Sequence, residues 1–160
     1  MTKKKRRLPP VEIPDVPHRI LPFNGNVVTD KMISFSFACF DRSHELFNLG
    51  GNTDDGVISG KWFVELLDCL KNVGNMTIPE MRQSKTHELH PIDWEHIKNT
   101  NPPKNSEQLE FWQFRISKSK GRVIGFILEN VFYVVWLDPY HNLVDSEGYG
   151  TIKVYPPFTL

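Results

Sequence analysis

The sequence has few cysteines and no long apolar segment. Only Cys39 and Cys69 are present among 160 residues, which excludes a framework of several disulfides. Two thiols in a chain of this length indicate a reducing compartment, although a single Cys39–Cys69 bridge stays open. No apolar run approaches the roughly 20 residues of a membrane span, and no apolar stretch follows the N-terminal charges as in a secretory signal. We therefore expect a cytoplasmic protein with no membrane partner.

An overall excess of charge is also lacking, because 19 basic and 19 acidic side chains balance. Five of the basic residues lie within positions 3–7, and the rest of the chain has 14 basic and 19 acidic side chains, a formal charge of −5. Nonspecific nucleic-acid binding requires a surface that is basic overall, and a domain with this charge balance does not have one. Any site for a polyanion must be a local patch or the N-terminal arm.

Residues 1–25 differ in composition from the rest of the chain. They combine the basic run with prolines that interrupt every helix: Pro9, Pro10, Pro14, Pro17 and Pro22. We predict a flexible basic, proline-rich arm over 1–25 and a single α+β domain over 26–160. The basic run is either a solvated end or a contact for nucleic acid.

The domain is predicted to contain a strand, two helices and then a three-strand antiparallel sheet. Alternating apolar residues indicate a strand over 32–40, and apolar residues at helical spacing indicate a helix over 61–73. The pair Thr77 and Glu80 forms a capping box for a second helix over 77–86. After an irregular connection over 87–108, strands are expected over 111–117, 122–129 and 131–138. A short edge strand is expected over 151–155.

Strand alternation predicts two unequal faces for this sheet, if Ser117 lies opposite Arg122 and Leu128 opposite Val131. One face is apolar and should pack against the helices: Trp112, Phe114, Ile116, Val123, Gly125, Ile127, Phe132, Val134 and Trp136. The other is expected to be a solvated, mixed face: Gln113, Arg115, Ser117, Arg122, Ile124, Phe126, Tyr133 and Val135. Lys118 and Lys120 lie in the adjoining turn. This second face is either a phosphate-binding surface or an ordinary solvated face.

Polar clusters with known chemistry are otherwise scarce. His87, His90, His96 and Asp93 match no zinc spacing, so we expect no metal and no cofactor. Either His141 or His90 could serve as a general base, and Asp138 either orients a histidine or caps the turn before Pro139. The chain has no nucleophile elbow, P-loop or dinucleotide fingerprint, which leaves serine-based and nucleotide-hydrolysing mechanisms without support.

The C-terminal third resembles a known family of small toxins. The segments 112–116 (WQFRI), 121–126 (GRVIGF) and 134–141 (VVWLDPYH) are similar to the basic strand, the following strand and the final strand and rim of the RelE/ParE toxin superfamily. The order of strand, two helices and three strands fits the same family. The chain departs from it in its length, its arm, the connection over 87–108 and its acidic domain.

The resemblance implies a RelE-like toxin that cleaves RNA on the ribosome without a metal and pairs with an antitoxin protein. It implies that Arg115 and Arg122 bind phosphate and that His141 acts as an acid or base. Lys118, Lys120, Gln113 and Tyr133 would then contact the substrate, Tyr133 by stacking on a base. The alternative is a non-catalytic module that binds a protein or nucleic acid through the sheet rim and the basic arm.

Overall fold

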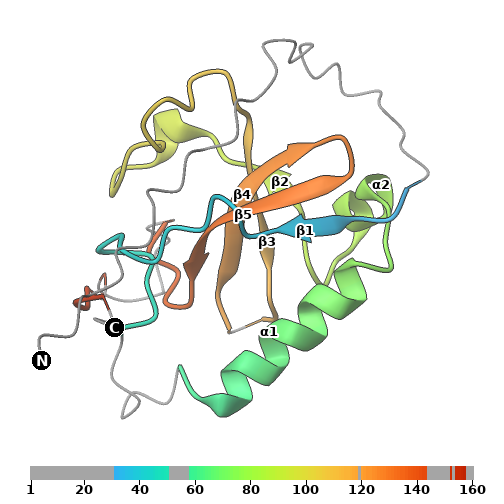
Figure 1. Ribbon diagram of the computed structural model, residues 1–160, viewed down its shortest axis with the longest axis horizontal. Helices are drawn as coiled ribbons and strands as arrows, with labels where there is room; N and C mark the ends of the chain where they lie inside the picture. The colour runs from blue at the N-terminus through green and yellow to red at the C-terminus, as the bar shows by residue number, and fades with distance from the viewer. Residues whose placement is uncertain (1–30, 51–57, 119, 144–151, 153, 158–160) are drawn as a thin grey trace, which may run out of the picture.

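The computed structural model describes residues 31–50, 58–118, 120–143, 152 and 154–157, and shows an α+β domain built on one sheet (Figure 1). Its elements are listed in chain order: β1 (Ser34–Ser36), α1 (Gly60–Val73), α2 (Ile78–Gln83), β2 (His90–Pro91), a 3₁₀ turn (Trp94–His96), β3 (Phe111–Arg115), β4 (Arg122–Leu128) and β5 (Val131–Asp138). The α+β class predicted from the sequence is confirmed. The predicted arm over 1–25 lies outside the described residues.

Each helix begins at a residue whose side chain caps it. Ser59 Oγ accepts a hydrogen bond from the backbone N–H of Trp62, and α1 buries its side chains at helical spacing: Trp62, Leu66, Cys69 and Val73. The capping box of Thr77 and Glu80 is present at the start of α2, as predicted. Helix α2 ends at Gln83, however, three residues earlier than expected.

The sheet is larger than the sequence indicated, with five strands in the order β1-β5-β4-β3-β2. The three predicted strands form its antiparallel centre, while the short β1 pairs parallel with β5 at one edge. The other edge is β2, which lies in the segment 87–108 that was expected to be irregular. The strand predicted over 32–40 is reduced to Ser34–Ser36. Of the edge strand expected over 151–155, the described Ile152, Val154 and Tyr155 adopt no strand conformation.

The strand registers correct two expectations. Arg122 lies opposite Arg115 and not opposite Ser117, because the β3–β4 connection is longer than a tight hairpin. The register of β4 with β5 holds from Leu128 to Gly125, but then shifts by one residue because Val135 forms a β-bulge. Gly125 permits the close approach at this bulge, since a Cβ there would lie 1.9 Å from the carbonyl oxygen of Tyr133.

One face of the sheet packs against the helices, as expected. Its core contains Trp62 and Leu66 of α1 together with Phe114, Val123 and Phe132 of the sheet. Figure 1 shows α1 lying along this side. The bulge accounts for one wrong assignment: Trp136 belongs to the opposite face, and Leu137 takes its place against the helices. The helix-covered face is therefore a conventional apolar core.

The other face is not the solvated surface that the sequence suggested. A second apolar cluster covers most of it: Phe47, Ile92, Phe111, Ile124, Phe126, Val135, Trp136 and Leu143. Three of these residues come from loops, and the ring of Phe47 packs against that of Trp136, with centroids 4.9 Å apart and ring planes tilted by 33°. Loops thus cover the second face much as helices cover the first. What remains of it near solvent is the end of the sheet that holds Arg115 and Arg122.

Two further observations bear on the sequence predictions. Cys39 and Cys69 are both free thiols, so the disulfide left open above is not formed. Within the described ranges, no helix is both long and apolar enough to cross a bilayer.

Candidate functional site

A row of four charged residues crosses one end of the loop-covered face. Arg115 of β3 lies directly opposite Arg122 of β4, and Arg122 lies opposite Asp138 of β5. At the β3 end, Glu88 precedes β2 and its carboxylate oxygen lies 2.6 Å from Arg115 Nη2. Residues directly opposite one another on antiparallel strands point to the same face. The two guanidiniums are therefore neighbours, with one acid on each side of the pair.

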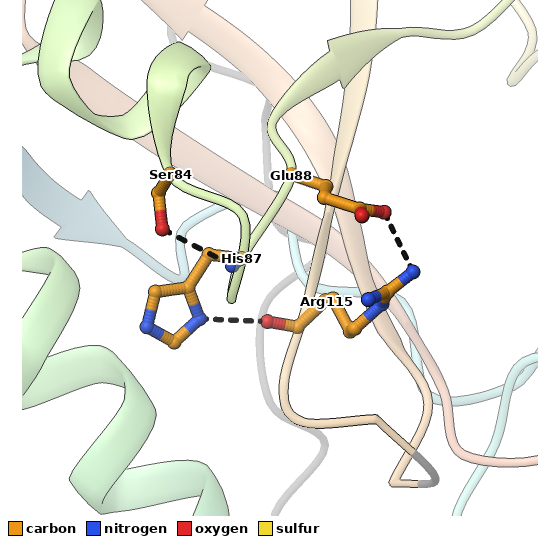
Figure 2. Close-up of polar contacts among 4 residues, drawn as sticks. All are labelled: Ser84, His87, Glu88 and Arg115. Carbon is orange, nitrogen blue, oxygen red and sulfur yellow. Dashed lines mark hydrogen bonds and ion pairs between the residues drawn. The ribbon is translucent and has the colours of Figure 1, made fainter.

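Arg115 is held firmly by its backbone. Its N–H donates to the carbonyl oxygen of His87 at 2.6 Å, and its own carbonyl oxygen accepts a hydrogen bond from His87 Nδ1 at 2.9 Å. Figure 2 shows His87 reaching the backbone of Arg115 and the next residue, Glu88, reaching its guanidinium. The side chain of Arg115 is 20% exposed and that of Glu88 is 48% exposed. The guanidinium is thus fixed in place close to open solvent.

Asp138 is the buried counterpart at the other end of the row. Its two carboxylate oxygens accept the backbone N–H groups of Asn142 and Leu143, at 2.8 and 2.9 Å. Burial raises the pKa of Asp138 to about 6, although these N–H groups and the charge of Arg122 act in the opposite direction. The carboxylate is therefore ionised at neutral pH. Asp138 both closes the turn after β5, as the sequence suggested, and faces Arg122.

Two histidines flank the guanidinium pair. His90 on β2 lies opposite Gln113 and on the same face as Arg115, whereas His141 follows β5 in the turn that Asp138 closes. Burial, together with the charges of Arg122 and Arg115, lowers the pKa of His141 to about 4. Burial and the same two arginines also lower the pKa of His90, which Glu88 partly counteracts. Both imidazoles are therefore neutral at pH 7.

Two polar atoms of β3 lack partners at this place. Gln113 is only 4% exposed, and its Oε1 has no hydrogen-bond donor among the described residues. Arg115 Nε is likewise buried without an acceptor in that part of the chain. Buried polar groups are nearly always paired, so each exception requires an explanation. Here the two atoms supply one acceptor and one donor on the face that carries the charged row.

The structure does not bring every predicted site residue to this row. Lys118 is exposed in the β3–β4 connection, and Lys120 Nζ lies 3.8 Å from Glu65 of α1, toward the helix-covered side. Tyr133 lies opposite Phe126, four residues along β4 from Arg122, which places it roughly 13 Å away. Its ring already stacks on Phe126, with centroids 5.0 Å apart. Of the seven predicted residues, Arg115, Arg122, His141 and Gln113 are gathered at one end of the face.

The remaining histidines have separate roles. His87 is buried against Cys69 and the Arg115 backbone, while the exposed His96 pairs with Asp93, 2.7 Å away. Across the ranges that the structure describes, no group of three His, Cys, Asp or Glu side chains is arranged to hold a metal ion.

Sequence reasoning missed Glu88 and underestimated His90. Both lie in the segment Glu88-Leu89-His90-Pro91-Ile92, in which Leu89 packs toward the helices and Ile92 toward the loops. The alternation over 89–92 is the signal for a short strand, and Glu88 precedes it with a φ of 47°. The surrounding prolines and histidines obscured it, and the segment was taken for an irregular connection.

Comparisons of the chain with protein-family models, with curated proteins and with solved structures find no match. The case for a function therefore depends on the geometry of the charged row and its two histidines.

Proposed function

We propose that this protein is a cytoplasmic, RelE-like toxin that cleaves RNA without a metal, with the phosphodiester bound by Arg115 and Arg122. His141 acts as the general base in this proposal. The resemblance of residues 112–141 to the RelE/ParE superfamily supports the same class of substrate, and extends it to RNA on the ribosome and to an antitoxin partner.

One observation carries the proposal: two guanidiniums lie directly opposite each other on adjacent strands. Like charges at directly opposed positions destabilise a sheet. The backbone clamp on Arg115 nevertheless holds its side chain in this position. A bound phosphate would relieve the repulsion, because its oxygens match the donor geometry of a guanidinium. The unpaired Nε of Arg115 adds a further donor for such an anion.

The chemistry expected at this site is transfer of the phosphoryl group to the neighbouring 2′-hydroxyl of RNA. The guanidiniums would stabilise the charge that develops on the phosphate oxygens. A neutral imidazole can accept the 2′-hydroxyl proton, and His141 is neutral at pH 7. Once the phosphate anion offsets the arginine charges, the pKa of both histidines should rise toward the neutral range, where proton transfer is most effective.

The test is cleavage of RNA by the purified protein, with free RNA and with translating ribosomes as substrates, followed by mapping of the RNA ends. Arg115→Ala and Arg122→Ala should each lower the rate by about 10²–10³-fold, the loss typical of removing a charge-stabilising donor. Arg82→Ala is the matched control, since Arg82 lies over Trp112 on the helix-covered side. Equal cleavage by Arg115→Ala and Arg82→Ala, or no cleavage by the native protein, would contradict the proposal.

A different observation favours a second candidate, a non-catalytic module that binds another protein. The outer side of α1 presents Phe63, Val64 and Leu67, each at least 41% exposed and together on one helical face. Contiguous exposed apolar side chains are typical of protein contact sites. This candidate predicts that Leu67→Asp abolishes a partner interaction measured by co-purification, while Arg115→Ala leaves it unchanged.

A further inference from the structure

The two histidines lie on opposite sides of the guanidinium pair. His90 is on β2, the strand beyond Arg115, and His141 follows β5, the strand beyond Arg122. A phosphate held by both arginines would therefore have one imidazole on each side. Cleavage of RNA at a phosphodiester needs two proton transfers on opposite sides of the phosphorus, one from the attacking hydroxyl and one to the leaving oxygen.

We propose that His90 is the general acid of this site and protonates the 5′ oxygen as it leaves. The proposal rests on the proposed function. In the reaction, the 2′-hydroxyl gives its proton to His141 and its oxygen bonds to phosphorus. The bond from phosphorus to the 5′ oxygen breaks, and that oxygen takes the proton of His90. The products are a 2′,3′-cyclic phosphate and a 5′-hydroxyl, and no other reactant is consumed.

The charges around each histidine assign the two roles. Arg115 of β3 and Arg122 of β4 act on both imidazoles, and the carboxylate of Glu88 also acts on His90. A carboxylate favours the protonated imidazole, so once a bound phosphate offsets the arginine charges, His90 is the histidine that carries the proton more readily. Burial and the two arginines keep His141 in its neutral form, which can accept a proton.

The positions of the two residues fit these roles as well. His90 is exposed, so it can exchange protons with solvent between turnovers, while His141 is half-buried beside Asn142 and Leu143. The cross-strand neighbour of His90 is Gln113, whose buried Oε1 lacks a donor among the described residues. This oxygen is an acceptor available to a hydroxyl or amino group of an RNA bound next to His90.

A substrate with sulfur in place of the bridging 5′ oxygen separates the acid from the base. A thiolate leaves readily without a proton, so loss of the general acid should affect only ordinary RNA. The His90→Ala variant should cleave ordinary RNA about 10²–10⁴-fold more slowly than the native protein does. It should cleave the sulfur substrate nearly as fast as the native protein. His141→Asn should be slow on both substrates, and asparagine tolerates the left-handed backbone at this position, where φ is 58°.

His96→Ala is the matched control, because His96 is an exposed histidine outside the site. Its rates on both substrates should equal those of the native protein. The role of His90 is overturned if His90→Ala is equally slow on both substrates, or unaffected on both, while the native protein cleaves. Failure of the native protein to cleave either substrate would instead overturn the proposed function and this inference with it.

Discussion

The two faces of the sheet are covered by different kinds of structure. Helix α1 and helix α2 cover one face with apolar side chains, and their backbone polar groups are satisfied within the helices. Loops cover the other face, and they need buried polar side chains to satisfy their backbone. Asn48 Nδ2 donates to the carbonyl oxygens of His44 and Tyr155, and Asn142 Nδ2 donates to that of Leu46.

This difference is the reason for placing the proposed site on the loop-covered face. The helix-covered face offers only packing, whereas the loop-covered face already contains buried polar groups and reaches solvent at the charged row. Binding and catalytic residues are commonly held on loops positioned by a rigid scaffold. Here the scaffold supplies Arg115 and Arg122, and the loops and the strand edge supply Glu88, His90 and His141.

The largest expected effect concerns the helix-covered face. Phe114 is fully buried there and packs edge-on against Phe132. Phe114→Ala should lower the free energy of unfolding by about 3–5 kcal/mol, because it removes a large ring and leaves a cavity. Urea denaturation measures this loss.

The matched variant on the opposite face is Phe47→Ala, which removes a ring of the same size from the loop layer. We expect local opening there, with faster amide exchange at Asn142 and Leu143 and continued protection of β3 and β4. Faster exchange throughout the sheet would show that the two layers unfold as one unit.

The next largest effect on stability is expected at Asp138, the buried carboxylate of the charged row. Asp138→Asn should lower the free energy of unfolding by about 2–4 kcal/mol, because it leaves Arg122 beside Arg115 without its buried acid. An amide also places an N–H donor against a backbone N–H that the carboxylate now accepts. Asp93→Asn is the control at an exposed turn, where little change is expected in the same urea titration. A similar loss in both variants would mean that the row contributes nothing beyond a turn.

A smaller effect is expected at the exposed end of the row. Glu88→Gln removes the carboxylate that competes with a phosphate for Arg115, and should tighten RNA binding by about 2–5-fold, the range of a half-exposed ion pair. Cleavage at neutral pH should nevertheless slow, since His90 loses the charge that favours its protonation. Binding isotherms and single-turnover rates separate the two effects. Weaker binding would show that Glu88 helps to hold the substrate.

The pH dependence of stability tests the histidine beside the charged row. The pKa of His141 is about 4 in the folded protein against 6.5 ordinarily, so the unfolded chain binds the extra proton between these values. Through His141, stability therefore rises as the pH rises from about 4 to 6.5. Asp138 acts in the opposite direction, since its raised pKa makes stability fall between pH 3.8 and about 6.

The difference in the free energy of unfolding between the native protein and His141→Asn isolates the histidine. As the pH rises from 4 to 6.5, the free energy of unfolding of the native protein should increase relative to that of the variant. Above pH 6.5 the difference should stay constant. A difference that is flat over the whole range would place His141 in contact with solvent and away from the arginines.

The sequence pattern predicts much of the fold because alternation and helical spacing determine which side chains are buried. The β3–β4 register is wrong by two residues, since no pattern sets the length of the connection over 116–121. An error of two keeps every side chain on its face, so Arg115 and Arg122 were still placed together. The bulge at Val135 is hidden within an apolar run, and its shift of one residue put Trp136 on the wrong side.

The cover over the second face could not be predicted for a different reason. It depends on asparagine side chains that bridge segments far apart in the chain, such as Asn99 to the carbonyl oxygen of Asn142. Such contacts leave no periodic signal. The proposed site residues on regular strands were therefore identified, while Glu88, which precedes the two-residue edge strand β2, was missed.

The parallel pairing of β1 with β5 has a consequence for synthesis. Residues 34–36 pair with residues 131–133, so at about 5–20 residues per second the first strand waits roughly 5–20 s for its partner. Arg122 and His141 likewise leave the ribosome long after Ser34–Ser36. A nascent chain consequently has no complete charged row until Asp138 has been made, and a chain truncated before β5 would leave β1 without its partner strand.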